Sequence, residues 1–171
     1  FPNLVTTVPV DFNMHFVTES SVATVFSAEA NGQIIGSQSF SAVNPDSSVK
    51  AINASIKNTI PLSSDNIAVK IKYDNNGVPS SKAYLNFIRV KAKRNLTGYN
   101  KQFRFQAAEA GTNIGVGEYQ ISNASSINQV WDITDIYNVQ KIENTSGSGL
   151  AFRANLGEIK KYIAVDGNDY Y

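Results

Sequence analysis

The alternation of apolar and polar residues predicts strands along most of the chain, and the longest apolar stretch is Ala83 to Leu96. Residues 84–88 are apolar at nearly every position, which is typical of a strand covered on both faces. Beyond them, apolar residues alternate with Arg89, Lys91 and Lys93, as the two-residue side-chain period of a strand requires. We therefore expect residues 83–94 to form a long interior strand in which Phe87 is buried.

A second strong local pattern lies at residues 22–41. Two alternating runs, 22–30 and 33–41, are joined by Asn31-Gly32, a pair that suits a type I′ turn because both residues tolerate positive φ. The sequence therefore predicts a β-hairpin that turns at Asn31-Gly32.

The remaining apolar runs are short and are separated by turn-forming residues, and the segment 1–12, which contains Pro2 and Pro9, is expected to be an extended arm or edge strand. We expect Ile52 and Ile56 to face the core and residues 103–105 to pair with the strand at 83–94. Residues 139–144 and 150–154 are candidates for another hairpin. Outside the stretch 83–94 and the hairpin, the predicted strands are 14–18, 49–58, 67–73, 103–105, 116–121, 130–133, 139–144, 150–154 and 161–165.

This pattern predicts the fold class. About ten short strands at regular spacing, with little or no helix between them, are typical of an all-β protein with a β-sandwich, jelly-roll-like architecture. Residues 1–171 are long enough for one domain with a sizeable core, and we expect a single sandwich domain. The start at Phe1-Pro2-Asn3 and the end at Tyr170-Tyr171 lead us to expect an excised fragment of a longer protein.

Charge and cysteine content exclude several functions. The net charge of +1 provides no field that attracts nucleic acid, and no apolar run is long enough for a membrane span, so neither partner is expected. The absence of cysteine removes disulfides, thiolate catalysis and cysteine metal sites. His15 is the only histidine, and we interpret it as structural or merely exposed.

The acidic residues do not form a recognisable metal or catalytic motif. Asp132 and Asp135 form one group, and Asp166, Asn168 and Asp169 form another, but neither has the spacing of a calcium loop. Turns and caps are the more common role of such side chains. No spacing singles out a carboxylate pair for glycoside hydrolysis, so we predict no catalytic residue, no metal site and no cofactor.

Two surface features carry weaker hypotheses. Arg89, Lys91 and Lys93, followed by Arg94, form a basic ladder that is either a contact surface for an acidic polysaccharide or protein, or a solvated strand face. Trp131 is either a sugar-stacking residue or a core aromatic, and its neighbours Val130 and Ile133 favour the core.

Three blocks, taken in order, resemble a known family. They are residues 84–90 (YLNFIRV), 130–139 (VWDITDIYNV) and 161–170 (KYIAVDGNDY). Their order and spacing resemble the β-rich region just upstream of the peptidase domain in the type IX secretion system sortases, which are relatives of the gingipain cysteine peptidases. The most specific element is Trp-Asp-Ile-Thr-Asp, followed some thirty residues later by Tyr-Ile-Ala-Val-Asp. The resemblance spans roughly the C-terminal half of the chain.

The resemblance implies a protein of the bacterial cell surface, on the extracellular side of the outer membrane. Its full-length form would be a cysteine peptidase that removes C-terminal sorting signals from secreted cargo and aids cargo attachment. The catalytic Cys and His of the family lie downstream, so no catalytic residue carries over to this chain. The implied role is a non-catalytic accessory domain. Its partners would be the downstream peptidase domain of the same chain and, as further candidates, secretion-system components or cargo.

Two expectations follow from these hypotheses. Tyr170 and Tyr171 lie directly after the last predicted strand, so we expect them at the junction with a following peptidase domain. The alternative function, from a different class, is a stand-alone carbohydrate-binding or adhesin-like sandwich module.

Overall fold

The structure, a computed structural model, describes residues 1–169, and it is all-β as predicted. The described strands are numbered β1 to β12 in chain order, and one short 3₁₀ helix, η1 (Ala108–Gly111), lies among them. The chain divides into two compact units, Phe1–Asn95 and the residues from Leu96 on, each with a core of its own.

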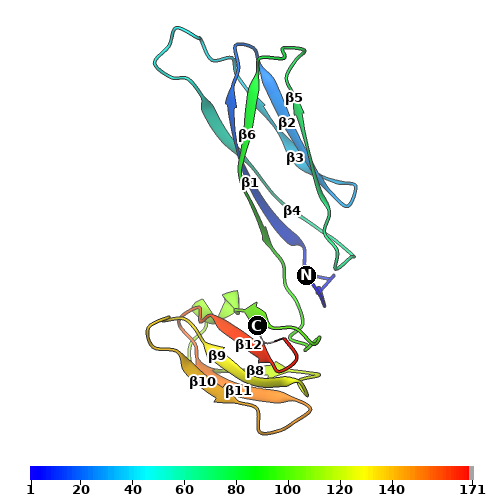
Figure 1. The fold of residues 1–171 in the computed structure, drawn as a ribbon, viewed down its shortest axis with the longest axis vertical. Helices are drawn as coiled ribbons and strands as arrows, with labels where there is room; N and C mark the ends of the chain where they lie inside the picture. Colours follow the sequence, from blue (N-terminus) through cyan, green and yellow to red (C-terminus); the bar gives the residue numbers. More distant parts are fainter. Residues whose placement is uncertain (170–171) are drawn as a thin grey trace. The chain divides into compact units, whose positions relative to one another are not determined.

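The first unit is a sandwich of two antiparallel three-stranded sheets, with strand orders β4-β1-β6 and β3-β2-β5 (Figure 1). Alternate residues of β1 face the core, and Phe16 stacks on Phe26 of the opposite sheet with ring centroids 4.2 Å apart. The period-two pattern therefore places one face of each sheet in a shared core. The strands are β1 (Val10–Glu19), β2 (Thr24–Ala30), β3 (Gln33–Phe40), β4 (Ile52–Ile60), β5 (Val69–Asp74) and β6 (Lys82–Lys91).

The predicted hairpin at residues 22–41 is confirmed. Strands β2 and β3 pair in antiparallel register, from Ala30 opposite Gln33 to Thr24 opposite Phe40. The two turn residues have positive φ, 49° at Asn31 and 80° at Gly32, as a type I′ turn requires. The prediction for β4 is also confirmed, since Ile56 is buried and Ile52 packs against the same core.

The prediction that residues 83–94 form an interior strand is wrong. Strand β6 lies at the edge of its sheet and pairs only with β1 among the described strands. Phe87 is consequently 37% exposed, and Leu85 and Ile88 are exposed as well. A run of apolar residues predicts a strand. It does not distinguish a central strand from an edge strand whose apolar side chains are exposed to solvent.

Residues 1–9 form an arm that is attached to the first unit, but the expectation for residues 1–12 is wrong in detail: the arm turns at residues 2–3 and 6–7, and residues 10–12 begin β1, the central strand of its sheet. Leu4 is buried and forms an antiparallel bridge with Arg94. The carboxylate of Asp65 accepts the backbone N–H groups of Asn3 and Leu4, both at 2.9 Å. One carboxylate therefore satisfies two backbone N–H groups that form no hydrogen bond with a neighbouring strand.

The second unit packs a four-stranded sheet, in the order β10-β9-β12-β7, against the two-stranded sheet β11-β8. Its core is aromatic: Tyr119 of β8 stacks on Phe152 of β11, and Tyr162 of β12 meets Phe152 edge to face. The strands are β7 (Phe103–Phe105), β8 (Val116–Ile121), β9 (Ile127–Asp132), β10 (Gln140–Glu143), β11 (Leu150–Asn155) and β12 (Tyr162–Asp166).

Three local predictions for this unit are wrong. Strand β7 pairs with β12, not with the strand at 83–94. Strands β10 and β11 lie in different sheets, paired with β9 and β8 respectively, and so do not form a hairpin. Trp131 is not a core residue, because it lies on the outer face of β9, is 39% exposed and donates its indole N–H to the side chain of Gln129. Pairing between strands depends on long-range packing that a local pattern does not contain.

The division into two units differs from the single domain that the sequence predicts. The boundary falls between Asn95 and Leu96, inside the apolar stretch that sequence analysis treats as one element. No run of Gly, Pro or Ser marks this boundary. Each described unit contributes six strands, fewer than the eight of a jelly roll.

Candidate functional site

The basic residues predicted as a surface contact are only partly brought together. Arg89 and Lys91 both lie on the outer face of the sheet, at the positions opposite Asn13 and Asp11 of β1. The Arg89 guanidinium carbon lies 5.6 Å from the centroid of the Phe87 ring, within cation–π range. Lys93 follows the end of β6, where its carbonyl accepts a hydrogen bond from the N–H of Val5 in the arm.

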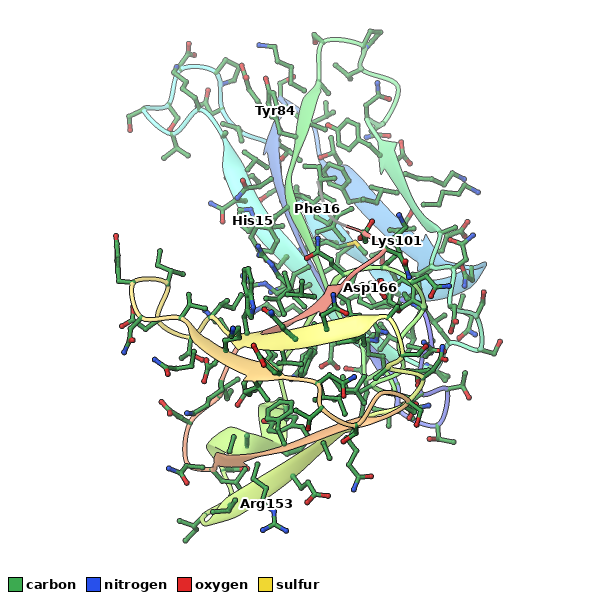
Figure 2. The ribbon with its side chains drawn as sticks, turned by 60° about the horizontal axis from the view of Figure 1, so that its bottom comes forward. His15, Phe16, Tyr84, Lys101, Arg153 and Asp166 are labelled. Carbon is green, nitrogen blue, oxygen red and sulfur yellow. The ribbon has the colours of Figure 1, made fainter. Side chains whose placement is uncertain are left out.

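His15 lies on the outer face of β1, next to this patch, whereas its neighbour Phe16 points into the core (Figure 2). The ring stacks on Phe87 at 5.6 Å. Its Nε2 lies 3.2 Å from the side-chain oxygen of Asn53, and its Nδ1 lies 3.3 Å from the side-chain nitrogen of Asn86. The side chains of Asn53 and Asn86 therefore hold the ring from either side by its two nitrogens.

The acidic residues of the two predicted groups serve turns and chain contacts. Asp132 accepts the backbone N–H of Thr134, Asp135 accepts that of Tyr137, and Asp166 accepts that of Asn168. The carboxylate of Asp169 accepts the N–H of Gln102, and the pKa of this carboxyl is held below its usual range first by Lys101 and then by that N–H. Within residues 1–169, no three acidic or histidine side chains gather as a metal site would need.

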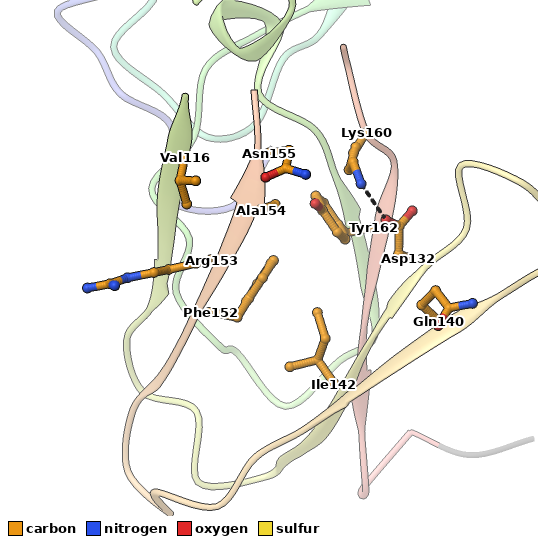
Figure 3. A pocket seen from close by; sticks show the side chains of 10 residues that line it. All are labelled: Val116, Asp132, Gln140, Ile142, Phe152, Arg153, Ala154, Asn155, Lys160 and Tyr162. Carbon is orange, nitrogen blue, oxygen red and sulfur yellow. Dashed lines mark ion pairs between the residues drawn. The ribbon is translucent and has the colours of Figure 1, made fainter. Parts of the chain in front are cut away.

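A hollow between the two sheets of the second unit is a candidate site. Its volume is about 380 Å³, and it is open to solvent. Figure 3 shows side chains from both sheets turned toward it. Its apolar wall includes Phe152 and Ile142, and its polar groups are Asp132, Gln140, Asn155, Lys160 and Tyr162.

Opposite charges are paired at the rim of this hollow. The ammonium of Lys160 lies 3.6 Å from a carboxylate oxygen of Asp132 and 3.5 Å from one of Glu158 (Figure 3 shows the first pair). Arg153, which also lines the hollow, forms an ion pair with Glu118 at 3.3 Å. The carboxylates therefore balance the cations, and the hollow has little net charge.

Tyr162 is the one polar residue of the hollow that lies deep in the core. It is only 1% exposed, and burial raises the pKa of its phenol, so the hydroxyl stays protonated at any physiological pH. Within the described part of the chain, this hydroxyl has no hydrogen-bond partner.

Little of this hollow is predictable from the sequence. Among its lining residues, only Asp132 belongs to one of the acidic groups noted above, and its sequence context favours a turn. Phe152 and Tyr162 lie in short strand-like runs like any core residues, so their pattern carries no signal for a cavity. The convergence of β9, β11 and β12 depends on sheet pairing, which appears only in the fold.

The expected junction residues, Tyr170 and Tyr171, lie outside the described residues. No helix in residues 1–169 is long and apolar enough to cross a membrane.

Comparison with known proteins finds a structural relationship that covers nearly the whole chain. No protein-family model matches the chain, and no curated protein matches it. Among solved structures, the chain is similar to that of dimeric latent PorU from Porphyromonas gingivalis, with a TM-score of 0.80 over 96% of this chain and 16% sequence identity. The chain spans only 16% of the PorU chain, so the similarity establishes a shared fold with a part of that protein.

Proposed function

We propose that this chain is a non-catalytic accessory β-domain of a PorU-like type IX secretion system sortase, positioned before a gingipain-like cysteine peptidase domain. The observation that carries the proposal is the structural similarity to PorU over nearly the whole chain. The three sequence blocks at 84–90, 130–139 and 161–170 support the same relationship independently. The full-length protein would act at the bacterial cell surface and remove C-terminal sorting signals from secreted cargo.

A deletion in the full-length protein tests this function. Removing residues 1–171 in the native organism should leave cargo with its C-terminal signal uncut or unattached, which immunoblots of cell-surface fractions measure. Restoring the segment should restore processing. Normal processing without the segment, or a gene in which no peptidase domain with Cys and His follows residue 171, would refute the proposal.

The absence of catalysis in this chain is the second part of the proposal. A cysteine peptidase needs a thiolate nucleophile, and the chain contains no cysteine. The purified chain should therefore hydrolyse no peptide. His15→Ala serves as the control, since turnover that survives repurification and disappears in this variant would contradict the proposal.

The accessory role itself is proposed to be structural support. Tyr170 and Tyr171 would pack against the following domain, because aromatic side chains bury a large area with few rotatable bonds. Calorimetry on a chain extended through that domain tests this role. Coupled unfolding that Tyr170→Ala/Tyr171→Ala weakens would support a packed junction, whereas two independent transitions, unchanged by the substitution, would refute it.

A further inference from the structure

Strand β6 has an edge that no other part of the described chain covers. On one side it pairs with β1, from Lys82 opposite Glu19 to Lys91 opposite Asp11. On the other side, no strand or loop of residues 1–169 forms a backbone hydrogen bond with it. Such an edge presents a row of free N–H and C=O groups with which a further strand can pair.

Apolar side chains are exposed on both faces of β6. On the core side, Leu85 and Ile88 lie opposite the fully buried Phe16 and Met14, yet they are 47% and 40% exposed. On the outer face, Tyr84 is 51% exposed. A strand that is apolar on both faces is typical of the interior of a sheet, where neighbouring elements cover it. The composition of β6 therefore fits a strand with a neighbour on each side.

Strand β5, an edge strand of the same unit, shows how an edge is protected. Its outward residues are Lys70, Lys72 and Asp74, and the apolar residues between them pack against the core. Charged residues within an edge strand discourage pairing with other chains. In β6, no charged residue lies between Lys82 and Arg89. The middle of β6 therefore lacks the protection that β5 has.

The charges at one end of β6 favour an acidic partner. Arg89 and Lys91 lie on the outer face, and neither forms an ion pair with another described residue. Arg89 lies over the ring of Phe87. The carboxylate of Asp11, opposite Lys91, accepts the hydroxyl of Thr59 at 2.7 Å instead. The strand thus offers two cations to a carboxylate from outside the chain.

The same charges disfavour a second copy of this chain as the partner. Strand β6 contains Lys82, Arg89 and Lys91 and no acidic residue. If two copies of β6 paired antiparallel along their full length, Lys82 of each copy would lie opposite Lys91 of the other. Like charges directly opposite each other destabilise a sheet. The edge therefore fits a strand of different composition better than it fits itself.

We propose that β6 is a docking edge for an extended segment of a partner protein in which acidic and apolar residues alternate. The segment pairs with residues 87–91, the regular part of the strand, because the register shift against β1 lies before Phe87. Its acidic side chains face Arg89 and Lys91, and its apolar side chains cover Ile88 and Val90. The inference concerns the first unit alone and does not depend on the proposed accessory role, so either proposal can fail without the other.

Binding is tested with the full 171-residue chain and a blocked octapeptide in which Glu and Val alternate. Titration should shift the NMR signals of the β6 amides saturably, and hydrogen exchange of these amides should slow because the added strand occupies their N–H groups. A peptide of the same composition, with all Glu residues before all Val residues, is the control for charge. It should bind about tenfold more weakly or less, because it cannot place Glu and Val on opposite faces of a strand.

A second control separates strand pairing from attraction between charges. The alternating octapeptide with a methyl group on every backbone nitrogen keeps its side chains and charge but has no N–H donor. Because an added strand is held by backbone hydrogen bonds, this peptide should not bind.

Arg89→Glu is the decisive variant. It places a carboxylate beside the acidic residues of the peptide, so affinity should fall about tenfold, and an octapeptide of alternating Lys and Val should bind this variant more tightly than the wild type. Lys57→Glu is the matched control. Lys57 and Arg89 both lie opposite Asn13 on the outer face, but Lys57 belongs to β4, on the far side of β1 from the docking edge. Its substitution should leave affinity unchanged.

Four results would overturn the proposal. The first is that the alternating peptide fails to bind or shifts no β6 amide. The second is that the block or methylated peptide binds as tightly. The third is that Arg89→Glu weakens binding no more than Lys57→Glu does. The fourth comes from sedimentation velocity and hydrogen exchange without peptide: a dimer in which the β6 amides become protected as the concentration rises would assign the edge to a second copy.

Discussion

At the scale of single residues, the face of the sheet on which a phenylalanine lies determines how much it contributes to stability. Phe16 is fully buried between the sheets of the first unit, whereas Phe87 on the neighbouring strand is 37% exposed. Phe16→Ala should lower the free energy of unfolding by about 3–5 kcal/mol, because it opens a cavity in the core. Phe87→Ala should lower it by only about 1 kcal/mol, since the ring lies on the outer face of the sheet and loses mainly its contacts with His15 and Arg89.

Urea unfolding of the two variants measures this difference. If Phe87→Ala costs as much as Phe16→Ala, then β6 is covered in solution by something that the described residues do not include. The sequence predicts that Phe87 is buried, and this prediction is wrong because period two assigns a face to a residue but not the neighbour that covers it.

Asp65 makes the stability of the first unit depend on pH. The N–H of Leu4, followed by that of Asn3, holds the pKa of this exposed carboxyl below its ordinary value of 3.8. A lowered folded-state pKa contributes stability that is present above the ordinary value and is lost as pH falls through the folded-state pKa. Asp65→Asn should therefore lower the melting temperature at pH 7.

The matching measurement in acid completes this test. The gap between wild type and Asp65→Asn should shrink as the pH falls below about 3.8, the ordinary pKa of the group. Melting curves at both pH values decide the question. An equal gap at both would show that the substitution acts through a change other than loss of the carboxylate charge.

At the scale of elements, the turn between β2 and β3 depends on one glycine. Gly32 has a φ of 80°, and a Cβ added there would meet no atom within 4 Å. Gly32→Ala should therefore lower the free energy of unfolding by about 1 kcal/mol through backbone strain alone. Gly149→Ala is the control, because its φ lies outside the left-handed region and its added Cβ would make ordinary contact. Equal losses in both variants would contradict the backbone explanation.

Elements whose signals are local were predictable from the sequence, whereas elements defined by distant partners were not. The hairpin at residues 22–41 carries its register in its own turn residues, and the inward side of β4 follows from Ile52 and Ile56. The partners of β7, β10 and β11 are set by sheet packing, and all three pairings differ from expectation. The hollow around Tyr162 is built from such pairings, so sequence analysis did not find it.

At the scale of the whole molecule, the two cores predict two independently folding units. No buried residue belongs to both core clusters described for the chain. Residues 1–95 and 96–171, produced separately, should each give a β-type circular dichroism spectrum and a cooperative unfolding transition. Collapse of either piece into an unfolded chain would show that its core needs the rest of the molecule.

The attachment of the arm also determines how the first unit would respond to pulling. The arm and the segment that follows β6 run antiparallel. The N–H of Val5 donates to the carbonyl of Lys93, and the N–H of Asn95 donates to the carbonyl of Asn3, each at 2.9 Å. Residues 1 and 95 lie at the same end of this antiparallel pair. Tension applied between them would therefore break these hydrogen bonds one after another rather than all at once. Because β1 and β6 continue the same antiparallel pairing, the opening would proceed from the arm into the sheet. The first unit would yield at low force from this end, while a pull along its strands from opposite ends would load the bonds together and meet greater resistance.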